Sequence, residues 1–299
     1  MLAIVIPFYK LTFFKETIQS IAKQTDKRFN IYIGDDASPE DCSSLINEFK
    51  DQFNIVYHRF DTNLGGISLT QHWDRCIALS KDEEWIIILG DDDVLDENVV
   101  KEFYNNFESI LESETNVVRF SSNIINEHSE KISELFTHPT LELASNFFCR
   151  KVQNLTRSSL SEYIFKRATY YKHRFVDYPL AWHSDDKAWL DFAENKPIFT
   201  INSACVCIRV SEINISGRQD NVPIKLLTSF QFFKDIISTN SQFDKNQIIE
   251  LLIYLEDFLK RHRKIRPVEW RFLLKYHLIY FRIPVFFKFL KNYRKAVFK

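Results

Sequence analysis

Short apolar runs alternate with amphipathic stretches over roughly the first 120 residues of the chain. The runs are bounded by Gly, Pro, Asn or Asp, which predicts buried strands, and between them apolar residues recur at helical spacing. The expected strands are Leu2–Ile6, Phe29–Ile33, Asn54–His58, Trp85–Leu89 and Asn116–Phe120. The expected helices are Phe13–Lys23, Pro39–Gln52, Ser68–Ser80 and Asp96–Ser113. This alternation predicts an α/β fold with a parallel sheet and right-handed crossovers.

The pattern weakens beyond Phe120. Asn123–Leu155 is polar with scattered aromatic residues and predicts loops and short strands, while Ser158–Arg167 suggests a short helix. The remaining expected elements are a helix from Ser184 to about Ala193, closing strands Pro197–Thr200 and Ala204–Val210, a polar loop Ser211–Val222, and helices Ile224–Asn240 and Asn246–Arg263.

Charge is distributed unevenly, although the formal net charge is only -1. Residues 260–299 contain 13 Lys and Arg and a single acid, Glu269, so that this tail carries +12 and the body −13. In the tail, aromatic and aliphatic residues alternate with cations at helical spacing, with a break at Pro284. Such a pattern favours a helix that lies in a membrane interface. Packing of the tail on the body, or between two copies, is the alternative. Nucleic acid binding is disfavoured because the body is acidic.

The five cysteines show no CxxC spacing, which favours a reducing cytoplasm over a disulfide framework. The chain begins without a signal-peptide pattern. It contains no uncharged apolar run of the length that spans a membrane.

Two acidic clusters follow expected strands at the same edge of the sheet. Asp35 and Asp36 come after the second strand, and Gly90 with Asp91, Asp92 and Asp93 comes after the fourth. Ligands of open α/β sheets bind at this edge. Three adjacent acids repel one another unless they are solvated or countered by a cation. The cluster is therefore a candidate Mg²⁺ or Mn²⁺ site, or else an acidic turn before a helix.

Neither a GxGxxG nor a GxxxxGK[ST] pattern follows the first strand. A bound nucleotide diphosphate would then be neutralised by the metal rather than by a glycine-rich loop. Four segments together resemble the family 2 glycosyltransferases of the GT-A fold, in that family's order and spacing: IVIPFYK at Ile4–Lys10, IGDDAS at Ile33–Ser38, NLGG at Asn63–Gly66 and LGDDDVL at Leu89–Leu95. The resemblance implies a Rossmann-like, mainly parallel sheet with a helical C-terminal extension.

The resemblance assigns a nucleotide site to the first half of the chain. The backbone of Pro7, Phe8 and Tyr9 would cradle the nucleoside, and Asp36, with Asp35 beside it, would contact uracil. Capping of the next helix by these acids, and mere packing of Tyr9, are the alternatives. Gly65 and Gly66 would allow close approach to the sugar nucleotide.

The metal motif of the family matches the three consecutive acids. Asp92 would bind the metal directly, Asp91 would hold the ribose or reach the metal through water, and Asp93 would support them. Family members often have an acid where this chain has Gly90, which leaves the division of roles open.

The motif of the general base resembles Asp185-Asp186, in the first turn of the helix after Ser184. The resemblance assigns the base to Asp186, with Asp185 as the alternative. A third interpretation is that both acids have no catalytic role and only stabilise the first turn of the helix. Trp182 and His183 would line the acceptor sugar. Arg218, in the polar loop, would lie near the phosphates, whereas His72 and Trp73 are expected to be packed.

These assignments predict a metal-dependent, inverting glycosyltransferase that uses a nucleotide sugar, most simply a UDP-sugar. The acceptor would be a saccharide or lipid-linked saccharide of a surface polysaccharide. Residues 1–222 would form the catalytic domain, with a nucleotide-binding half (1–120) and an acceptor-binding half (121–222); residues 223–299 would form the helical region. We expect a cytoplasmic protein whose tail, over residues 268–299, contacts the inner face of the membrane or a second copy. The alternatives are a nucleotidyltransferase that makes the sugar nucleotide and a catalytically silent binding module.

Overall fold

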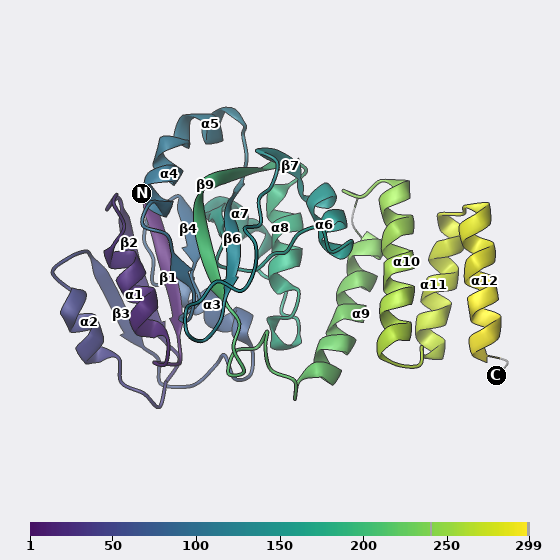
Figure 1. Ribbon diagram of the computed structural model, residues 1–299, viewed down its shortest axis with the longest axis horizontal. Coiled ribbons are helices and arrows are strands. Elements are labelled where there is room, and N and C mark those ends of the chain that lie inside the picture. The colour runs from purple at the N-terminus through teal and green to yellow at the C-terminus, as the bar shows by residue number, and fades with distance from the viewer. Residues whose placement is uncertain (240, 298–299) are drawn as a thin grey trace.

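The computed structural model describes residues 1–239 and 241–297. The helix expected to end at residue 240 and the tail expected to reach residue 299 therefore extend outside the described residues at positions 240, 298 and 299. Within these limits a single mixed sheet lies between two layers of helices, and helices α9–α12 stand side by side beyond it (Figure 1).

The sheet has nine strands in the order β3-β2-β1-β4-β8-β6-β9-β5, with β7 paired to β9. The strands are β1 Leu2–Phe8, β2 Phe29–Asp35, β3 Ile55–Arg59, β4 Trp85–Ile88, β5 Val94–Leu95, β6 Val117–Ile125, β7 Leu141–Leu143, β8 Tyr163–Lys166 and β9 Pro197–Arg209. Strands β3, β2, β1 and β4 are mutually parallel. The expected parallel α/β core is therefore confirmed for these four strands.

The helices follow the strands in the alternation that the sequence predicts for the first half. They are α1 Phe14–Ala22, α2 Ser43–Phe49, α3 Leu69–Ile77, α4 Val99–Asn105, α5 Phe107–Glu112, α6 Ala144–Val152, α7 Arg167–His173, the 3-10 helix η1 Pro179–Ala181, α8 Ser184–Ala193, α9 Val222–Thr239, α10 Lys245–His262, α11 Pro267–Ile279 and α12 Ile283–Val297.

Strand periodicity explains why β1 and β4 are apolar throughout. Alternate residues of a strand point to opposite faces, and both faces of these strands are covered by helices. Leu2, Ile4 and Ile6 join one hydrophobic core with helices α1, α2 and α4. Ala3 and Val5 join the other core, with helices α3, α6, α8 and α9–α12.

Strand β1 continues through Pro7 to Phe8, so the expectation that Pro7 ends it is wrong. Val5 O accepts from Leu89 N at 2.9 Å, and the pleat turns Pro7 toward the same side. The last residue of β4 that pairs with β1 lies opposite Val5, so no residue of β4 is paired with Pro7. The N–H group that proline lacks is therefore not required for a hydrogen bond between these strands.

Strand β8 corrects the expectation of a short helix over 158–167. It lies between β4 and β6 and is antiparallel to both, so the expected fifth strand is not a neighbour of the fourth. Tyr163, Ile164 and Phe165 are buried, although successive residues of a strand point to opposite faces. So short an apolar run has no periodicity by which a strand could be distinguished from a buried helix.

Further boundaries differ from the sequence pattern. The helix expected from Pro39 begins at Ser43, and the one expected over Asp96–Ser113 is two helices that break at Asn106. Helix α6 lies in the segment expected to hold only loops and strands, and the two closing strands are one strand, β9, whose register shifts against β6.

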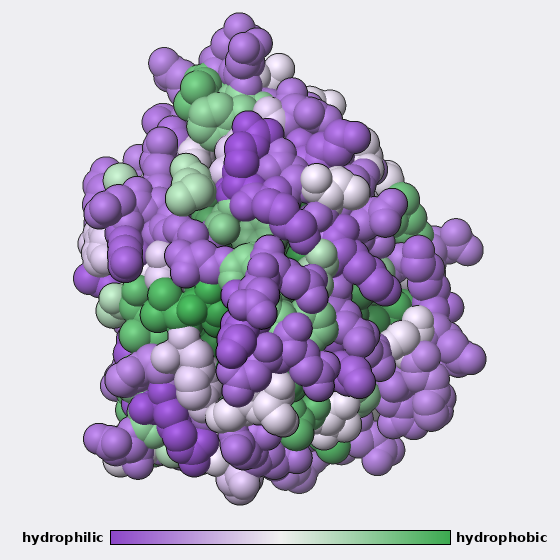
Figure 2. Space-filling view, turned by 90° about the vertical axis from the view of Figure 1, so that its left-hand side faces the viewer, coloured by the Kyte–Doolittle hydropathy of each residue, from purple (hydrophilic) through white to green (hydrophobic). Residues whose placement is uncertain are grey.

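The helical region shares its core with the sheet. Phe232 of α9, Leu255 of α10 and Phe289 of α12 belong to the same hydrophobic cluster as Val5 of β1. The expected boundary at residue 222 coincides with the start of α9, and strand β6 crosses the one at residue 120. The opposite end of the molecule, where α2 and β3 lie, is largely hydrophilic with small apolar patches (Figure 2).

Candidate active site

The three consecutive acids lie where β4 ends, beside the exits of β1 and β9. Asp91 Oδ2 accepts hydrogen bonds from the backbone N–H groups of Tyr9 and Lys10, each at 2.8 Å. Asp93 accepts from Arg209 N at 2.8 Å and from Ser161 Oγ at 2.5 Å. Asp91 therefore links the end of β4 to the end of β1, and Asp93 links it to the end of β9.

Asp92 is the least satisfied of the three carboxylates. Among the described residues, its side chain has one long hydrogen bond, at 3.4 Å from Asn214 Nδ2. Burial and the charge of Asp92 raise the pKa of Asp91 to about 7 and that of Asp93 to about 8. Burial also raises the pKa of Asp92. A cation beside Asp92 would relieve this concentration of negative charge.

The three acids do not form a complete metal site by themselves, but one of them could bind a cation together with a substrate. No group of three or more acidic, His or Cys side chains in the described part of the chain is arranged as a ready-made metal site. Mg²⁺, however, is commonly held by one or two carboxylates together with substrate phosphates and water. Asp92, with its free coordination capacity, suits that arrangement, while Asp91 and Asp93 are engaged within the protein.

Gly90 is explained by the packing of the acids that follow it. A Cβ atom at this position would lie 2.9 Å from Asp92 Oδ1 and 3.0 Å from Asp93 Oδ2. The carboxylates fold back over the glycine, so a larger residue would displace them. The present positions of Asp92 and Asp93 therefore require a glycine here.

The loop of residues 211–221 lies against the acids. Asn214 contacts Asp92, and Lys10 Nζ donates to Ile213 O, which ties the loop to the exit of β1. The loop expected over Ser211–Val222 is present, except that Val222 already begins α9. Arg218 is exposed and pairs with Asp220 at 2.5 Å, so it does not reach the three acids in this structure.

The expected nucleotide-binding acids are buried and engaged. Asp35 accepts from Ser38 N, Tyr57 and Arg59, and no part of it is exposed. It therefore organises the turn after β2 rather than capping α2.

Asp36 accepts from Leu64 N at 2.8 Å and Gly65 N at 2.9 Å, and also from Arg75. A Cβ at Gly65 would lie 2.6 Å from Asp36 Oδ2, so this glycine is required by the approach of Asp36. A contact of Asp36 with uracil stays a prediction.

The residues at the exit of β1 divide between core and surface. Phe8 is fully buried, and its ring lies 4.6 Å from that of Phe14, so only its backbone is available to a ligand. Pro7 and Tyr9 are partly exposed, and Tyr9 O accepts from Ser38 Oγ at 2.7 Å. Their arrangement is compatible with a backbone cradle.

Asp185 and Asp186 occupy the first turn of α8, as the sequence predicts. The helix begins at Ser184, but its N-cap is His183 and no side chain caps it, because Ser184 Oγ donates to Val176 O. A helix N-terminus favours nearby negative charge.

The two carboxylates have different surroundings. Asp186 is 3% exposed and pairs with Lys151 of α6 and with His183 Nδ1 at 2.8 Å. Burial opposes its ionisation, but Lys151 and His183 outweigh burial and hold the pKa of Asp186 well below its usual range. Asp185 is less buried, and desolvation together with the charge of Asp186 raises its pKa to about 7.

The turn before α8 has an unusual backbone. Leu180, Ala181 and His183 have φ values of 61°, 51° and 69°, in the left-handed region that is unfavourable for residues with a Cβ. Trp182 Nε1 and His183 Nε2 both contact Ser229 Oγ of α9, at 3.1 and 3.0 Å. Strain of this kind persists where the surroundings enforce it, and it concentrates at functional sites.

Residues 161 and 162 connect the two acidic groups. Ser161 donates to Asp93, and its neighbour Glu162 acts electrostatically on Asp185. Glu162 is fully buried and pairs with Arg157 at 2.7 Å. The segment that leads into β8 therefore contacts the acids at the end of β4 and carries a buried acid whose charge acts on Asp185.

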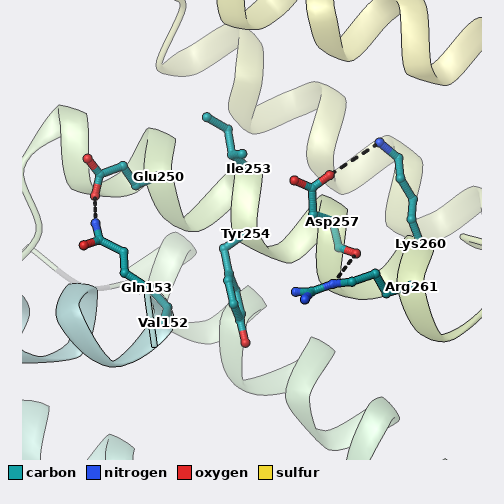
Figure 3. A pocket seen from close by; sticks show the side chains of 8 residues that line it. All are labelled: Val152, Gln153, Glu250, Ile253, Tyr254, Asp257, Lys260 and Arg261. Atoms are coloured by element: carbon teal, nitrogen blue, oxygen red, sulfur yellow. Dashed lines mark hydrogen bonds and ion pairs between the residues drawn. The ribbon is translucent and has the colours of Figure 1, made fainter. Parts of the chain in front are cut away.

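A cleft of about 600 Å³ opens between α6 and α10, beyond the ion pair of Asp186 (Figure 3). Val152 and Gln153, which line it, follow Lys151 directly. Tyr254 also lines the cleft, together with acids and cations: Glu250, Asp257, Lys260 and Arg261. Its ring lies 5.3 Å from that of Phe233, which in turn contacts His183.

Sequence reasoning missed several residues that build the site. Ser161, Asn214, Lys151 and Arg209 contact the acids from distant parts of the chain. Arg209 alone had a signal, as a cation in the otherwise apolar run Ala204–Val210.

Comparison with known proteins identifies the family. The model of the family described as "Glycosyl transferase family 2" matches residues 3–173, more than half of the chain. The chain belongs to glycosyl transferase family 2. The glycosyltransferase GlyG of Streptococcus pneumoniae serotype 4 is 26% identical over 119 residues, which are 40% of this chain and 38% of that relative. The match thus spans well under two thirds of the relative's length.

Solved structures establish the fold. Residues 1–349 of TarS from S. aureus, in complex with UDP-GlcNAc, superpose with a TM-score of 0.65 at 13% identity, over 93% of this chain and 80% of that one. GalNAc-T7 with UDP, GalNAc and Mn²⁺ has a TM-score of 0.53 at 13% identity, over 86% and 54%. The family 2 chain thus has the GT-A-like fold that the resemblance implies, followed by helices α9–α12.

Proposed function

We propose that this chain transfers a sugar from a nucleotide sugar, most simply a UDP-sugar, to a hydroxyl of a saccharide, with inversion at the anomeric carbon. The observation that carries the proposal is the under-satisfied Asp92 at the end of β4, whose side chain has one long hydrogen bond, from Asn214 of the polar loop. Family membership and the fold shared with the UDP-GlcNAc complex of TarS support it.

The donor would lie at the exits of β1 and β4. The backbone of Pro7–Tyr9 would hold the nucleoside, and residues 211–221 would lie over the diphosphate. A Mg²⁺ or Mn²⁺ bound by Asp92 would neutralise the diphosphate and stabilise the charge on the leaving UDP. Asp91 and Asp93 keep Asp92 in place through their bonds to Tyr9, Lys10 and Arg209.

The base would come from the start of α8. Asp186 is the residue that the resemblance favours, but its ion pairs with Lys151 and His183 keep it anchored and weakly basic. We therefore propose Asp185 as the group that accepts the acceptor's proton, because its raised pKa suits a base near neutral pH. Asp186 would position it. Trp182 and His183, on the strained turn, would border the acceptor.

The test combines nucleotide binding with turnover. Calorimetric titration of UDP should show tighter binding with Mn²⁺, and Asp92→Asn should remove that increment while Asp82→Asn, which changes an exposed acid outside the proposed site, keeps it. UDP release from UDP-GlcNAc and related donors should fall at least 100-fold in Asp92→Asn.

Other outcomes separate the alternatives. Unchanged metal-dependent UDP binding in Asp92→Asn would show that the metal assignment is wrong. A silent binding module would bind UDP with metal and release none from any donor. A nucleotidyltransferase would instead release pyrophosphate from UTP and a sugar phosphate.

A further inference from the structure

Helices α11 and α12 form a hairpin at the end of the molecule farthest from β3 (Figure 1). One side of the hairpin is packed: Trp270, Leu273, Tyr276 and Phe289 are buried. The ring of Phe289 lies 5.7 Å from that of Trp270 and 4.5 Å from that of His277. Burial of these side chains holds the hairpin on the body. The exposed side chains of the hairpin are not needed for this packing.

The turn of the hairpin leaves large apolar side chains in solvent. Leu278, Ile279, Phe281, Ile283 and Phe287, here called the tail turn, are 45–64% exposed. They fall within ten consecutive positions, which separates them from the singly scattered apolar residues of an ordinary surface. Isolated exposed residues need no explanation, but five large apolar residues exposed within so short a segment do.

Cations surround the tail turn and continue along α12. Exposed Lys and Arg side chains of the hairpin are Arg271, Lys275, Arg282, Lys288, Lys291, Arg294 and Lys295. No acid occurs between residues 270 and 299. Among the described residues none of these seven cations forms an ion pair. This positive charge is therefore available to a partner.

We propose that the tail turn and its cations dock on the surface of an anionic lipid bilayer. Exposed aromatic and aliphatic side chains enter the interfacial region, and Lys and Arg contact the lipid phosphates. A second copy presenting the same surface would place cations against cations, which disfavours symmetric pairing through the tail turn. No helix in the described part of the chain is long and apolar enough to cross a bilayer, so the contact is peripheral.

Vesicle co-sedimentation of the full chain, without substrate, tests this proposal independently of the proposed function. The protein should sediment with vesicles that contain phosphatidylglycerol and far less with pure phosphatidylcholine, and added salt should weaken binding. Lys288→Gln/Lys291→Gln/Lys295→Gln should bind roughly 100-fold more weakly, at about fivefold per cation.

The apolar part is tested separately. Ile279→Ser/Ile283→Ser/Phe287→Ser should lose binding, whereas Leu111→Ser/Ile132→Ser/Leu135→Ser, which changes exposed apolar residues elsewhere, should bind like the unaltered chain. Both sets are exposed, so thermal unfolding should be unchanged. Equal binding by the two variants, or no binding to anionic vesicles at low salt, would overturn the proposal. So would sedimentation equilibrium that shows a dimer lost only in the first variant, which would assign the surface to a second copy.

Discussion

At the scale of single residues, two adjacent carboxylates of the same type have opposite acidities. Asp185 and Asp186 share the first turn of α8, yet the cation of Lys151 and the ring of His183 contact only Asp186. The negative charge that these groups stabilise on Asp186 is itself one of the causes that raise the pKa of Asp185. Adjacent acids in a sequence therefore say little about which one is a base.

This asymmetry predicts different pH profiles for two variants. A base works when deprotonated, so kcat/KM of the unaltered chain should fall as the pH drops below about 7, the raised pKa of Asp185. Asp185→Asn should lower kcat by 10²–10⁴-fold and remove that limb.

Asp186→Asn is the matched control. It removes the negative charge next to Asp185, so turnover should persist with its acidic limb moved to lower pH. Measurement of kcat/KM against pH decides the assignment. Loss of turnover in Asp186→Asn with retention in Asp185→Asn would assign the base to Asp186.

At the scale of elements, Arg209, the last residue of β9, connects several elements that build the site. The side chain of Arg209 has no exposed surface; it donates to Asp92 O at 2.9 Å and Asn126 O at 2.8 Å, and pairs with Glu16 of α1 at 2.6 Å. One buried cation thus joins α1, the acidic turn and the strand that carries the polar loop.

Arg209→Met should therefore destabilise the protein by about 3 kcal/mol, because buried carbonyl groups lose their donors. Chemical denaturation measures the change. Arg218→Met removes an exposed cation of the neighbouring loop and should leave the midpoint where it was. Equal midpoints for both variants would contradict the role of Arg209.

At the scale of the whole molecule, the helical region and the sheet share one hydrophobic cluster. Leu255 of α10 is fully buried in the cluster that also contains Val5 and Ile86 of the sheet. A boundary near residue 222 is therefore a change of element within a continuous core.

Leu255→Ala should lower stability by about 3 kcal/mol through the lost contacts and the cavity. Hydrogen exchange followed by mass spectrometry should show β1 and β4 losing protection together with α10. Leu141→Ala, at a half-exposed position, should change neither. If α10 alone became less protected, residues 223–299 would unfold independently of the sheet, which would contradict the shared core.

The sequence by itself determined the parallel core of four strands, the acidic turns at their ends, the two-acid start of α8 and the helical tail. These features depend on local patterns: uninterrupted apolar runs, glycine, and acids placed after strands. Tertiary structure alone decided that β8 enters between β4 and β6, which of the three acids at the end of β4 remains unsatisfied, and which apolar residues of the tail stay exposed. The reason is physical. Burial, ion pairing and hydrogen-bond supply come from Lys151, Ser161, Arg209 and Asn214, which are remote in the chain and meet the acids only when it folds.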